Sequence, residues 1–240
     1  MKDILKRILC FLHIAVTRNQ RYDAYTRKII RMTLKPGANC IDIGCHKGDI
    51  LDLMIRYAPG GRMFGFEPVP GLFHDLETKY AGIPEVKLIA VALYDQKGTT
   101  DFQFVKNAPA YSGIKQRRYD GMEADIERIS VQTDRLDDLL PRDLEIRLIK
   151  IDVEGAEFRV MQGTHETIRR WKPVIIFEFG LGAADFYNAG PDELYAFLVK
   201  ECGMQISTLS GYLNGNNPLT GAEFARLFHE GKEYYFISHP

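Results

Sequence analysis

Four acidic residues stand where apolar, strand-like segments of the sequence end: Asp42, Glu67, Asp152 and Glu178. A single carboxylate in such a place is most often a helix cap or a solvated loop residue. The carboxyl ends of parallel strands, however, share one edge of a sheet, and open α/β sheets bind their ligands at that edge. Carboxylates there can accept hydrogen bonds from sugar hydroxyls or take a proton from a reacting group. We therefore expect these four acids to mark a functional edge.

A glycine turn follows the first of these acids. Residues 39–49 read N-C-I-D-I-G-C-H-K-G-D, and a helix-like pattern comes next. Gly44 and Gly48 permit a tight turn and a close approach of ligand to backbone, which a Cβ would obstruct. A strand, a glycine turn and a helix together present backbone N–H groups to a nucleotide-like ligand. An ordinary turn between a strand and a helix has the same appearance, so this stretch alone does not decide the function.

The spacing of the second acid narrows the ligand class. Glu67 lies 19 residues after Gly48, near the distance at which an acid on the second strand binds ribose hydroxyls. The glycine pattern is G-x-x-x-G, whereas dinucleotide binding uses G-x-G-x-x-G, and no G-x-x-x-x-G-K-[ST] motif occurs. These absences argue against an NAD- or FAD-dependent oxidoreductase and against a P-loop NTPase. A nucleoside without a polyphosphate fits better, and S-adenosylmethionine is the obvious candidate.

The elements that position these residues alternate between short strands and helices. Strands are expected over 40–43, 62–66, 86–93, 129–132, 146–151 and 173–179. Helices are expected over 49–57, 72–80, 134–140 and 192–202, and one that follows Glu157 is expected to end at Ile168 or Trp171. This alternation is typical of a parallel sheet buried on both faces. Two further strands, over 204–209 and 234–238, are expected to be antiparallel and to flank a loop rich in Asn and Gly. The expected fold class is therefore α/β, with a mostly parallel central sheet, helices on both faces and an antiparallel C-terminal strand.

Two segments extend this domain. Residues 1–33 are expected to form a helical N-terminal cap, and residues 34–240 the main domain. The apolar run at 8–16 is too short to span a bilayer, so we expect an amphipathic packing helix, with weak peripheral membrane contact as the alternative. Residues 99–128 are expected to form a lid-like insertion: a strand with one wet face over 99–105, then a long loop over 107–128.

The amino-acid composition excludes several other classes of protein. The chain has 240 residues, 45% of them hydrophobic, and a formal net charge of −1, which is ordinary for one large globular domain. No basic excess indicates nucleic-acid binding. The four cysteines do not form a CxxC pair, so neither a zinc site nor a disulfide scaffold is expected: Cys10, Cys40, Cys45 and Cys202. Reduced thiols indicate a cytoplasmic protein.

Five sequence blocks carry a family resemblance. They are Ile41-Asp42-Ile43-Gly44 with Gly48; Phe66-Glu67-Pro68 with Pro70; Ala92-Leu93-Tyr94-Asp95 with Gly98; Lys150-Ile151-Asp152-Val153-Glu154-Gly155-Ala156-Glu157 with Gly163; and Pro173 with Glu178. With these blocks the chain resembles the FkbM family of S-adenosylmethionine-dependent methyltransferases. K-I-D-V-E-G-A-E is the most specific of them. The resemblance covers roughly residues 38–180 and implies a class I, Rossmann-like methyltransferase fold.

The resemblance implies roles for individual residues. Asp42, Gly44 and Gly48 would shape the methionine end of the cofactor pocket, and Glu67 would hold the ribose hydroxyls. Ala92 and Leu93 would lie near the adenine, and Ser112 of the inserted segment would close over the site. Cys45 and Pro68 are also expected to bind the cofactor. Asp152 and Glu154 would face the sulfonium and the acceptor.

One departure from the family pattern lies in the glycine turn. The family usually has Ala-Asn where this chain has Cys45-His46. His46 could replace the hydrogen bond of the missing amide, reach the acceptor as a base, or be a surface loop residue. Asp152 is the first expectation for the general base, followed by Glu154 and His46. Acids at the start of a helix also favour its dipole, which is the alternative for Glu154 and Glu157. No metal is expected.

The resemblance implies transfer of a methyl group to a hydroxyl of a sugar or another small molecule, including a glycan or glycolipid. The alternative is a catalytically silent, methyltransferase-like binding module. Cofactor binding and turnover distinguish the two.

Overall fold

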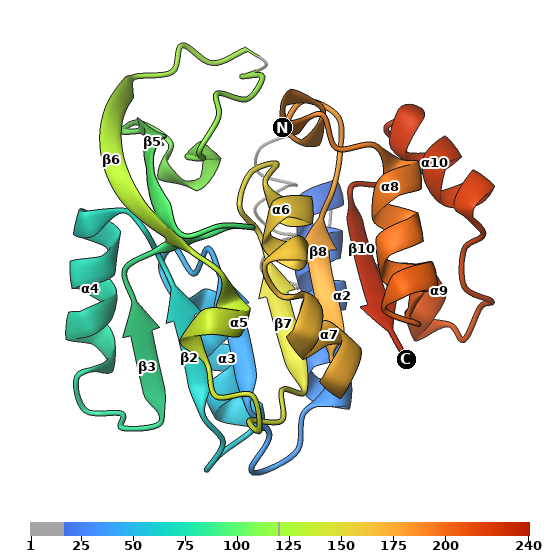
Figure 1. Cartoon of the computed structure of the whole chain (residues 1–240), viewed down its shortest axis with the longest axis horizontal. Helices are drawn as coiled ribbons and strands as arrows, with labels where there is room; N and C mark the ends of the chain where they lie inside the picture. The colour runs from blue at the N-terminus through green and yellow to red at the C-terminus, as the bar shows by residue number, and fades with distance from the viewer. Residues whose placement is uncertain (1–16, 120) are drawn as a thin grey trace, which may run out of the picture.

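The computed structural model of the chain describes residues 17–119 and 121–240. Its centre is a seven-stranded sheet (Figure 1), in the order β3 (Val86–Ile89), β2 (Met63–Phe66), β1 (Cys40–Ile43), β7 (Leu148–Ile151), β8 (Val174–Glu178), β10 (Tyr235–His239) and β9 (Gln205–Thr208). β10 runs antiparallel to both of its neighbours, while the other pairs along the sheet are parallel. The predicted mostly parallel sheet with a late antiparallel strand is confirmed.

Helices cover both faces of this sheet, and the strands are apolar for that reason. In β1, the side chain of Ile41 joins one hydrophobic cluster and that of Cys40 joins the other, as the period of two along a strand requires. One cluster includes residues of α6 (Glu157–Gln162), α7 (His165–Trp171), α8 (Pro191–Tyr195) and α10 (Gly221–His229). The other includes residues of α2 (Arg18–Thr33), α3 (Asp49–Tyr57), α4 (Pro70–Tyr80) and α9 (Leu209–Leu213).

Helix α2 supplies the described part of the expected N-terminal cap. It begins with a capping box between Thr17 and Gln20, a pattern that satisfies the first free N–H groups of a helix. Its buried residues, Tyr22, Ile29 and Ile30 among them, pack into the same cluster as α3 and α9. The apolar run at 8–16 lies outside the described residues. Among the described helices, none is long and apolar enough to cross a membrane.

A second, smaller sheet forms the inserted segment. β5 (Gly98–Val105) pairs antiparallel with β6 (Ile126–Asp134), and β4 (Ala92–Leu93) pairs parallel with the end of β6. A short 3₁₀ turn, η1 (Pro109–Tyr111), lies between the two long strands. The strand expected over 99–105 is present. The loop expected over 107–128 is wrong at its end, because residues 126–128 already belong to β6, where they pair with Val105 and its neighbours.

Three other expectations need correction. The single strand expected over 86–93 is two strands, β3 and β4, which belong to different sheets. The helix expected over 157–171 is divided between α6 and α7 near Gly163, where a Cβ would overlap the backbone carbonyl of Tyr94. The helix expected over 192–202 is present, but its second half, η3 (Ala196–Glu201), is π-helical.

Short helices also occupy segments that the sequence analysis left without one. η2 (Ala184–Tyr187) follows β8, and the loop expected between β9 and β10 contains α9 and α10. α10 begins with a capping box between Thr220 and Glu223. By contrast, the short strand expected over 129–132 is present as part of β6. The short helix expected over 134–140 is present as α5 (Leu136–Leu139), which anchors Leu136 in the core.

Candidate functional site

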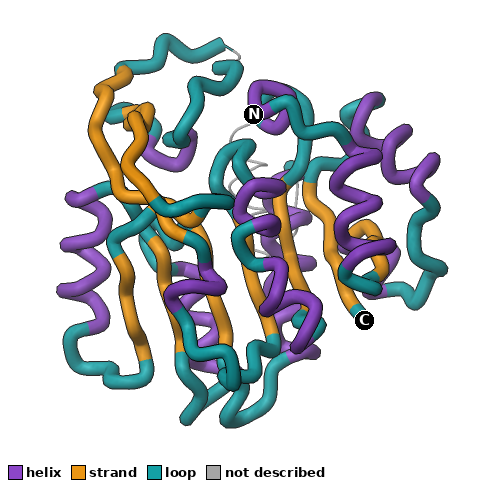
Figure 2. The backbone as a smooth tube through the Cα atoms, viewed as in Figure 1, coloured by secondary structure: helices purple, strands orange, loops and turns teal. Residues whose placement is uncertain are grey.

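An open pocket lies at the carboxyl edge of the parallel strands. Figure 2 shows the loops that cross this upper edge, between the small inserted sheet and the helices. The pocket encloses about 590 Å³ of empty space, part of it continuous with bulk solvent. Nine of the twelve predicted site residues line it: Gly44, His46, Glu67, Pro68, Ala92, Leu93, Ser112, Asp152 and Glu154. The structure therefore brings together residues from strands that are far apart in the sequence.

The glycine turn lies directly against the loop that follows β7. Gly44 has φ of 79°, and a Cβ there would overlap the backbone carbonyl of Asp152. Both the left-handed backbone and the lack of space require glycine at this position. Gly48, also at φ 79°, lies against the hydroxyl of Tyr80, which donates to the Gly48 carbonyl at 2.8 Å. The turn is thus fixed by packing on both sides.

Three predicted residues shape this turn without lining the pocket. Cys45 and Gly48 are buried beneath it. Asp42 is 2% exposed, and the backbone N–H of Leu51 in the first turn of α3 stabilises its charged form. Burial, with the nearby charges of Asp152 and Glu67, nevertheless raises the pKa of Asp42 to about 7. Asp42 lies under the helix that carries the turn, and it acts on the site through that helix.

Glu67 is the buried acid at the end of β2. Its Oε2 accepts a hydrogen bond from the backbone N–H of His46 at 2.9 Å, and its Oε1 accepts one from Val69 at 3.0 Å. Burial raises the pKa of Glu67 to about 7 in spite of these two donors. Each carboxylate oxygen accepts about two hydrogen bonds. Glu67 thus retains acceptor capacity toward the pocket and joins the glycine turn to the second strand.

Asp152, at the end of β7, is the most strongly held acid in the pocket. Its Oδ2 accepts hydrogen bonds from Lys150 Nζ at 2.9 Å and from the hydroxyl of Tyr235 at 2.5 Å. Burial opposes the charge, but Lys150, Tyr235 and a hydrogen bond from Glu178 outweigh it and lower the pKa of Asp152. Burial and the charge of Asp152 raise the pKa of Glu178 well above its usual range. Asp152 is therefore the more acidic member of the pair, and Glu178 is the member that holds a proton more tightly.

Glu154 lies across the pocket mouth in an ion pair with Arg117 of the inserted segment. It adopts a left-handed backbone with φ of 58°, which is uncommon for a residue other than glycine. The carboxylate oxygens of Asp152, Glu154 and Glu178 lie within 4.8 Å of one another, a spacing that a metal ion could bridge. Lys150 pairs with Asp152 and Arg117 pairs with Glu154, so two of these three carboxyl groups already lie beside a cationic side chain.

Glu157 has a structural role in the loop after β7. Its Oε1 accepts hydrogen bonds from the backbone N–H groups of Val153 and Gly155, both at 3.1 Å. It is 1% exposed, and burial raises its pKa to about 7. The carboxylate thus closes the loop that presents Asp152 and Glu154.

His46 and Ser112 are the neutral polar groups of the pocket. The Nε2 atom of His46 is buried and has no hydrogen-bond partner among the described residues. Burial and the charge of Lys47 lower the pKa of His46, so its imidazole is neutral at pH 7. The hydroxyl of Ser112 accepts from the backbone N–H of Val105 at 3.0 Å, which leaves its own hydrogen free to donate.

Several residues of the site escaped the sequence analysis as functional groups. Lys150 and Tyr235 hold Asp152, and apolar side chains form much of the wall: Phe66, Val69, Leu72, Val91, Phe102 and Ile114 among them. A signal existed for Lys150, because it lies two residues before Asp152 and side chains two apart share one face of a strand. Tyr235 gave no such signal, since nothing local relates it to β7.

Comparison with known proteins identifies the relatives of this chain. A family model described as the methyltransferase FkbM domain matches residues 42–206. The 2-O-methyltransferase NoeI of Sinorhizobium fredii is 31% identical over 156 residues, which are 60% of this chain and 64% of that protein. The methyltransferase sdnD of Sordaria araneosa is 28% identical over 171 residues, 55% of this chain and 66% of that protein. The match thus spans slightly less than two thirds of either relative.

Solved structures share the fold. A methyltransferase FkbM from Methylobacillus flagellatus aligns with a TM-score of 0.52 at 12% identity, over 100% of this chain and 60% of that one. A putative rRNA-methylase from Clostridium thermocellum aligns with a TM-score of 0.50 at 12% identity, over 90% of this chain and 92% of that one. At such identities these matches establish the fold, and they confirm the predicted Rossmann-like class I methyltransferase architecture.

Proposed function

The chain belongs to the FkbM methyltransferase family, and on this premise we propose that it transfers a methyl group from S-adenosylmethionine to a hydroxyl oxygen of a sugar or another small molecule. S-adenosylmethionine is the methyl donor of the family. One observation carries the proposal: a single pocket is lined by both Glu67 and Asp152. Glu67 suits a hydrogen bond with the ribose of the methyl donor, and Asp152 suits removal of a proton from the hydroxyl of the acceptor.

We propose that the cofactor lies along the ends of β1, β2 and β4. Glu67 would accept hydrogen bonds from the ribose hydroxyls with the acceptor capacity that its two backbone donors leave unused. Ala92 and Leu93, with the apolar wall that includes Phe102, suit an adenine ring. The glycine turn, with Gly44 at its centre, would receive the methionine portion through backbone N–H groups.

The chemical step needs little covalent work from the protein, because the sulfonium is already activated. The acceptor oxygen has to be held in line with the methyl group, at about 3 Å. The new C–O bond takes its electron pair from the hydroxyl oxygen, and the breaking S–C bond leaves its pair on sulfur. We propose that the hydroxyl proton passes to Asp152. A protonated ether is a far stronger acid than a carboxylic acid, so even a carboxylate of lowered pKa accepts that proton.

Glu154 and His46 take other roles in this proposal. The carboxylate of Glu154 is paired with Arg117, so it is less available as a base than Asp152. His46 donates its backbone N–H to Glu67, which places it on the cofactor side of the pocket. Its free Nε2 suits a hydrogen bond to the cofactor, in place of the amide that the family usually has there.

The acceptor class is supported by the relatives and by charge. One relative is named a 2-O-methyltransferase, which supports oxygen as the acceptor atom. A formal net charge of −1 favours a small molecule, including a glycan or glycolipid, over nucleic acid. The free thiols of Cys40, Cys45 and Cys202 support a reducing, cytoplasmic location.

The test is transfer of a tritiated methyl group from S-adenosylmethionine to a panel of glycosides, simple alcohols and phenols. Mass spectrometry would then locate the added methyl group. We expect a methyl ether with at least one glycoside class. Asp152→Asn should lower turnover about 100-fold or more, as for loss of a general base, and should leave the affinity for S-adenosylhomocysteine within about threefold.

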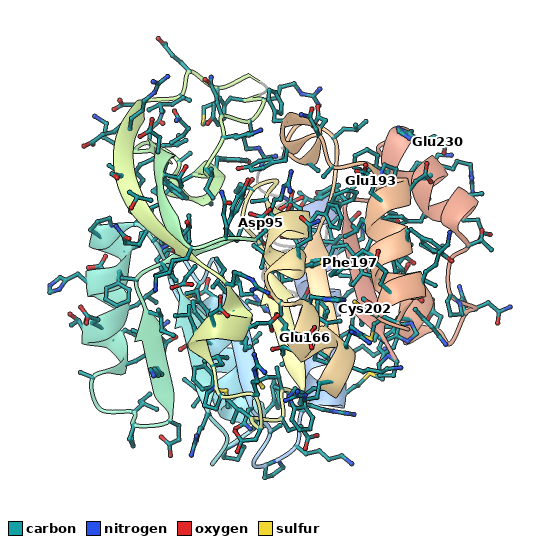
Figure 3. All side chains as sticks on the ribbon, in the orientation of Figure 1. Asp95, Glu166, Glu193, Phe197, Cys202 and Glu230 are labelled. Carbon is teal, nitrogen blue, oxygen red and sulfur yellow. The ribbon has the colours of Figure 1, made fainter. Side chains whose placement is uncertain are left out.

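A matched control is available for that variant. Asp95, labelled in Figure 3, pairs with Arg159 at 3.0 Å and does not line the pocket. Asp95→Asn should therefore keep normal turnover. Wild-type protein that binds the cofactor and methylates no hydroxyl in the panel would contradict the proposed function.

A further inference from the structure

Tyr235 brings a hydroxyl into the pocket region from the antiparallel strand β10. This hydroxyl donates to Asp152 Oδ2 at 2.5 Å, and Lys150 Nζ donates to the same oxygen at 2.9 Å. The ammonium also lies 4.9 Å from the centre of the Tyr235 ring. Two donors on one carboxylate oxygen fix the plane and direction of the group and leave the second oxygen for other partners.

We propose that Tyr235 is a positioning residue for methyl transfer: together with Lys150 it holds Oδ2 of Asp152 and so fixes the direction in which the carboxylate faces the acceptor hydroxyl. This inference rests on the proposed function. In the transfer step the acceptor oxygen forms the bond to carbon, sulfur keeps the electron pair of the broken bond, and the proton moves to the carboxylate of Asp152. Tyr235 itself neither gains nor loses a proton in this step.

The topology of the sheet makes this contact possible. β10 lies beside β8 in antiparallel register, with Tyr235 opposite Glu178, and β8 lies beside β7. The tyrosine therefore reaches over Glu178 toward the end of β7. Burial, together with the charge of Asp152, raises the pKa of Tyr235 well above its usual range. The raised pKa favours the neutral phenol, which is the form that donates its hydrogen to Asp152.

Titratable groups from several elements surround Asp152. They belong to Asp23 of α2, Asp42 of β1, His46 of the glycine turn, Lys150 of β7, Glu157 of α6, Glu178 of β8 and Tyr235 of β10, beside the ion pair of Glu154 and Arg117. Lys150 is the one cation in this set whose ammonium touches Asp152. Loss of the tyrosine hydroxyl leaves that ammonium in place, so Asp152 stays ionised but becomes less well oriented.

A neighbouring tyrosine supplies a matched control. The Tyr22 ring lies 5.1 Å from the Tyr235 ring, and the Tyr22 hydroxyl also donates to a carboxylate at 2.5 Å. Its acceptor is Glu233, which does not line the pocket. Tyr22→Phe thus removes the same kind of hydrogen bond from the same aromatic cluster without touching Asp152.

The experiment compares Tyr235→Phe, Tyr22→Phe and the wild type. For Tyr235→Phe we expect kcat to fall about tenfold or more, as for loss of one hydrogen bond to a charged group, with the KM for S-adenosylmethionine within about twofold. The acid limb of the kcat profile should move to higher pH, because a lost donor raises the pKa of Asp152. Carbon-13 NMR of labelled aspartate, assigned with Asp152→Asn, should report the same rise in the ligand-free protein. Tyr22→Phe should match the wild type in each measurement.

The outcomes separate this inference from the proposed function. Wild-type protein that transfers a methyl group, with a Tyr235→Phe variant of unchanged kcat and unchanged Asp152 titration, would overturn the role of Tyr235 alone. Equal losses in the two phenylalanine variants would also overturn it, since they would indicate a general effect on the aromatic cluster. Wild-type protein without any transfer would refute the proposed function, and the NMR titration would still show whether Tyr235 holds Asp152.

Discussion

Glu67→Gln should weaken cofactor binding and remove its dependence on pH. The carboxylate of Glu67 has a pKa of about 7 because it is buried. Only the charged form offers acceptors to the ribose hydroxyls at both oxygens. The substituted amide has one acceptor oxygen, which it can turn toward the N–H of either His46 or Val69 but not both. The variant thus loses a hydrogen bond to a charged group, a cost of about 1.5–3 kcal/mol, or roughly 10- to 150-fold in affinity.

The pH dependence follows from the same pKa. With a pKa of about 7, Glu67 is charged in about nine tenths of molecules at pH 8 and in about one tenth at pH 6. Apparent affinity scales with the fraction of protein competent to bind. The dissociation constant of S-adenosylhomocysteine should therefore be about tenfold higher at pH 6 than at pH 8 for the wild type. Glu67→Gln should lose this dependence.

Isothermal titration calorimetry with S-adenosylhomocysteine from pH 6 to pH 8 measures both effects. The titration of the ligand itself cancels in the difference between variant and wild type. Glu157→Gln is the matched control, because Glu157 is another buried glutamate with a pKa of about 7 that accepts backbone N–H groups, and it does not line the pocket. A pH dependence that persists in Glu67→Gln, or disappears in Glu157→Gln, would refute the reasoning.

Two further predictions concern stability. Asp42, Glu67 and Glu157 have folded-state pKa values of about 7, above the ordinary values of 3.8 and 4.5, so the folded protein binds more protons than the unfolded chain between about pH 4.5 and 7. The ligand-free protein should therefore lose stability as pH rises through this window. Scanning calorimetry should find a higher Tm at pH 6 than at pH 8. A higher Tm at pH 8 would contradict the inference that burial raises the pKa values of these three acids. Gly163→Ala should lower the free energy of unfolding by at least about 2 kcal/mol, because the added Cβ would overlap the carbonyl of Tyr94; chemical denaturation measures this change. The affinity for S-adenosylhomocysteine, measured by titration calorimetry, should stay unchanged, since Gly163 does not line the pocket.

The sheet and much of the pocket are readable from the sequence because their signals are local. Apolar strands alternate with helices, and acids directly follow β2 and β7, which is why Glu67 and Asp152 are found at the pocket edge. Asp42 differs from them, because it lies within β1 and not after it. Strand periodicity groups it with Cys40, on the face that packs against α3, so its place under the helix is also a local consequence.

Other parts of the site depend on contacts between distant segments. Tyr235 meets Asp152 only because β10 enters the sheet beside β8, a choice of topology that no short stretch encodes. The pairing of Arg117 with Glu154 depends on how the inserted segment, which has no clear period, folds back over the pocket. The requirement for glycine at position 163, between α6 and α7, likewise depends on the carbonyl of Tyr94, which lies outside both helices. Residue propensities and sequence spacing do not predict such contacts.

The late position of β10 has a consequence for synthesis on the ribosome. β9 pairs with no strand of the described sheet other than β10, and β10 is the last of the described strands to be made. Until it emerges, the nascent chain carries β8 with an open edge and β9 without a partner, and such unpaired edges favour association between chains. The buried residues Phe236 and Ile237 then complete both hydrophobic clusters at once. Closure of the sheet and arrival of the Tyr235 hydroxyl beside Asp152 are therefore one event, so a chain that has not finished folding lacks one of the two donors that order the Asp152 carboxylate.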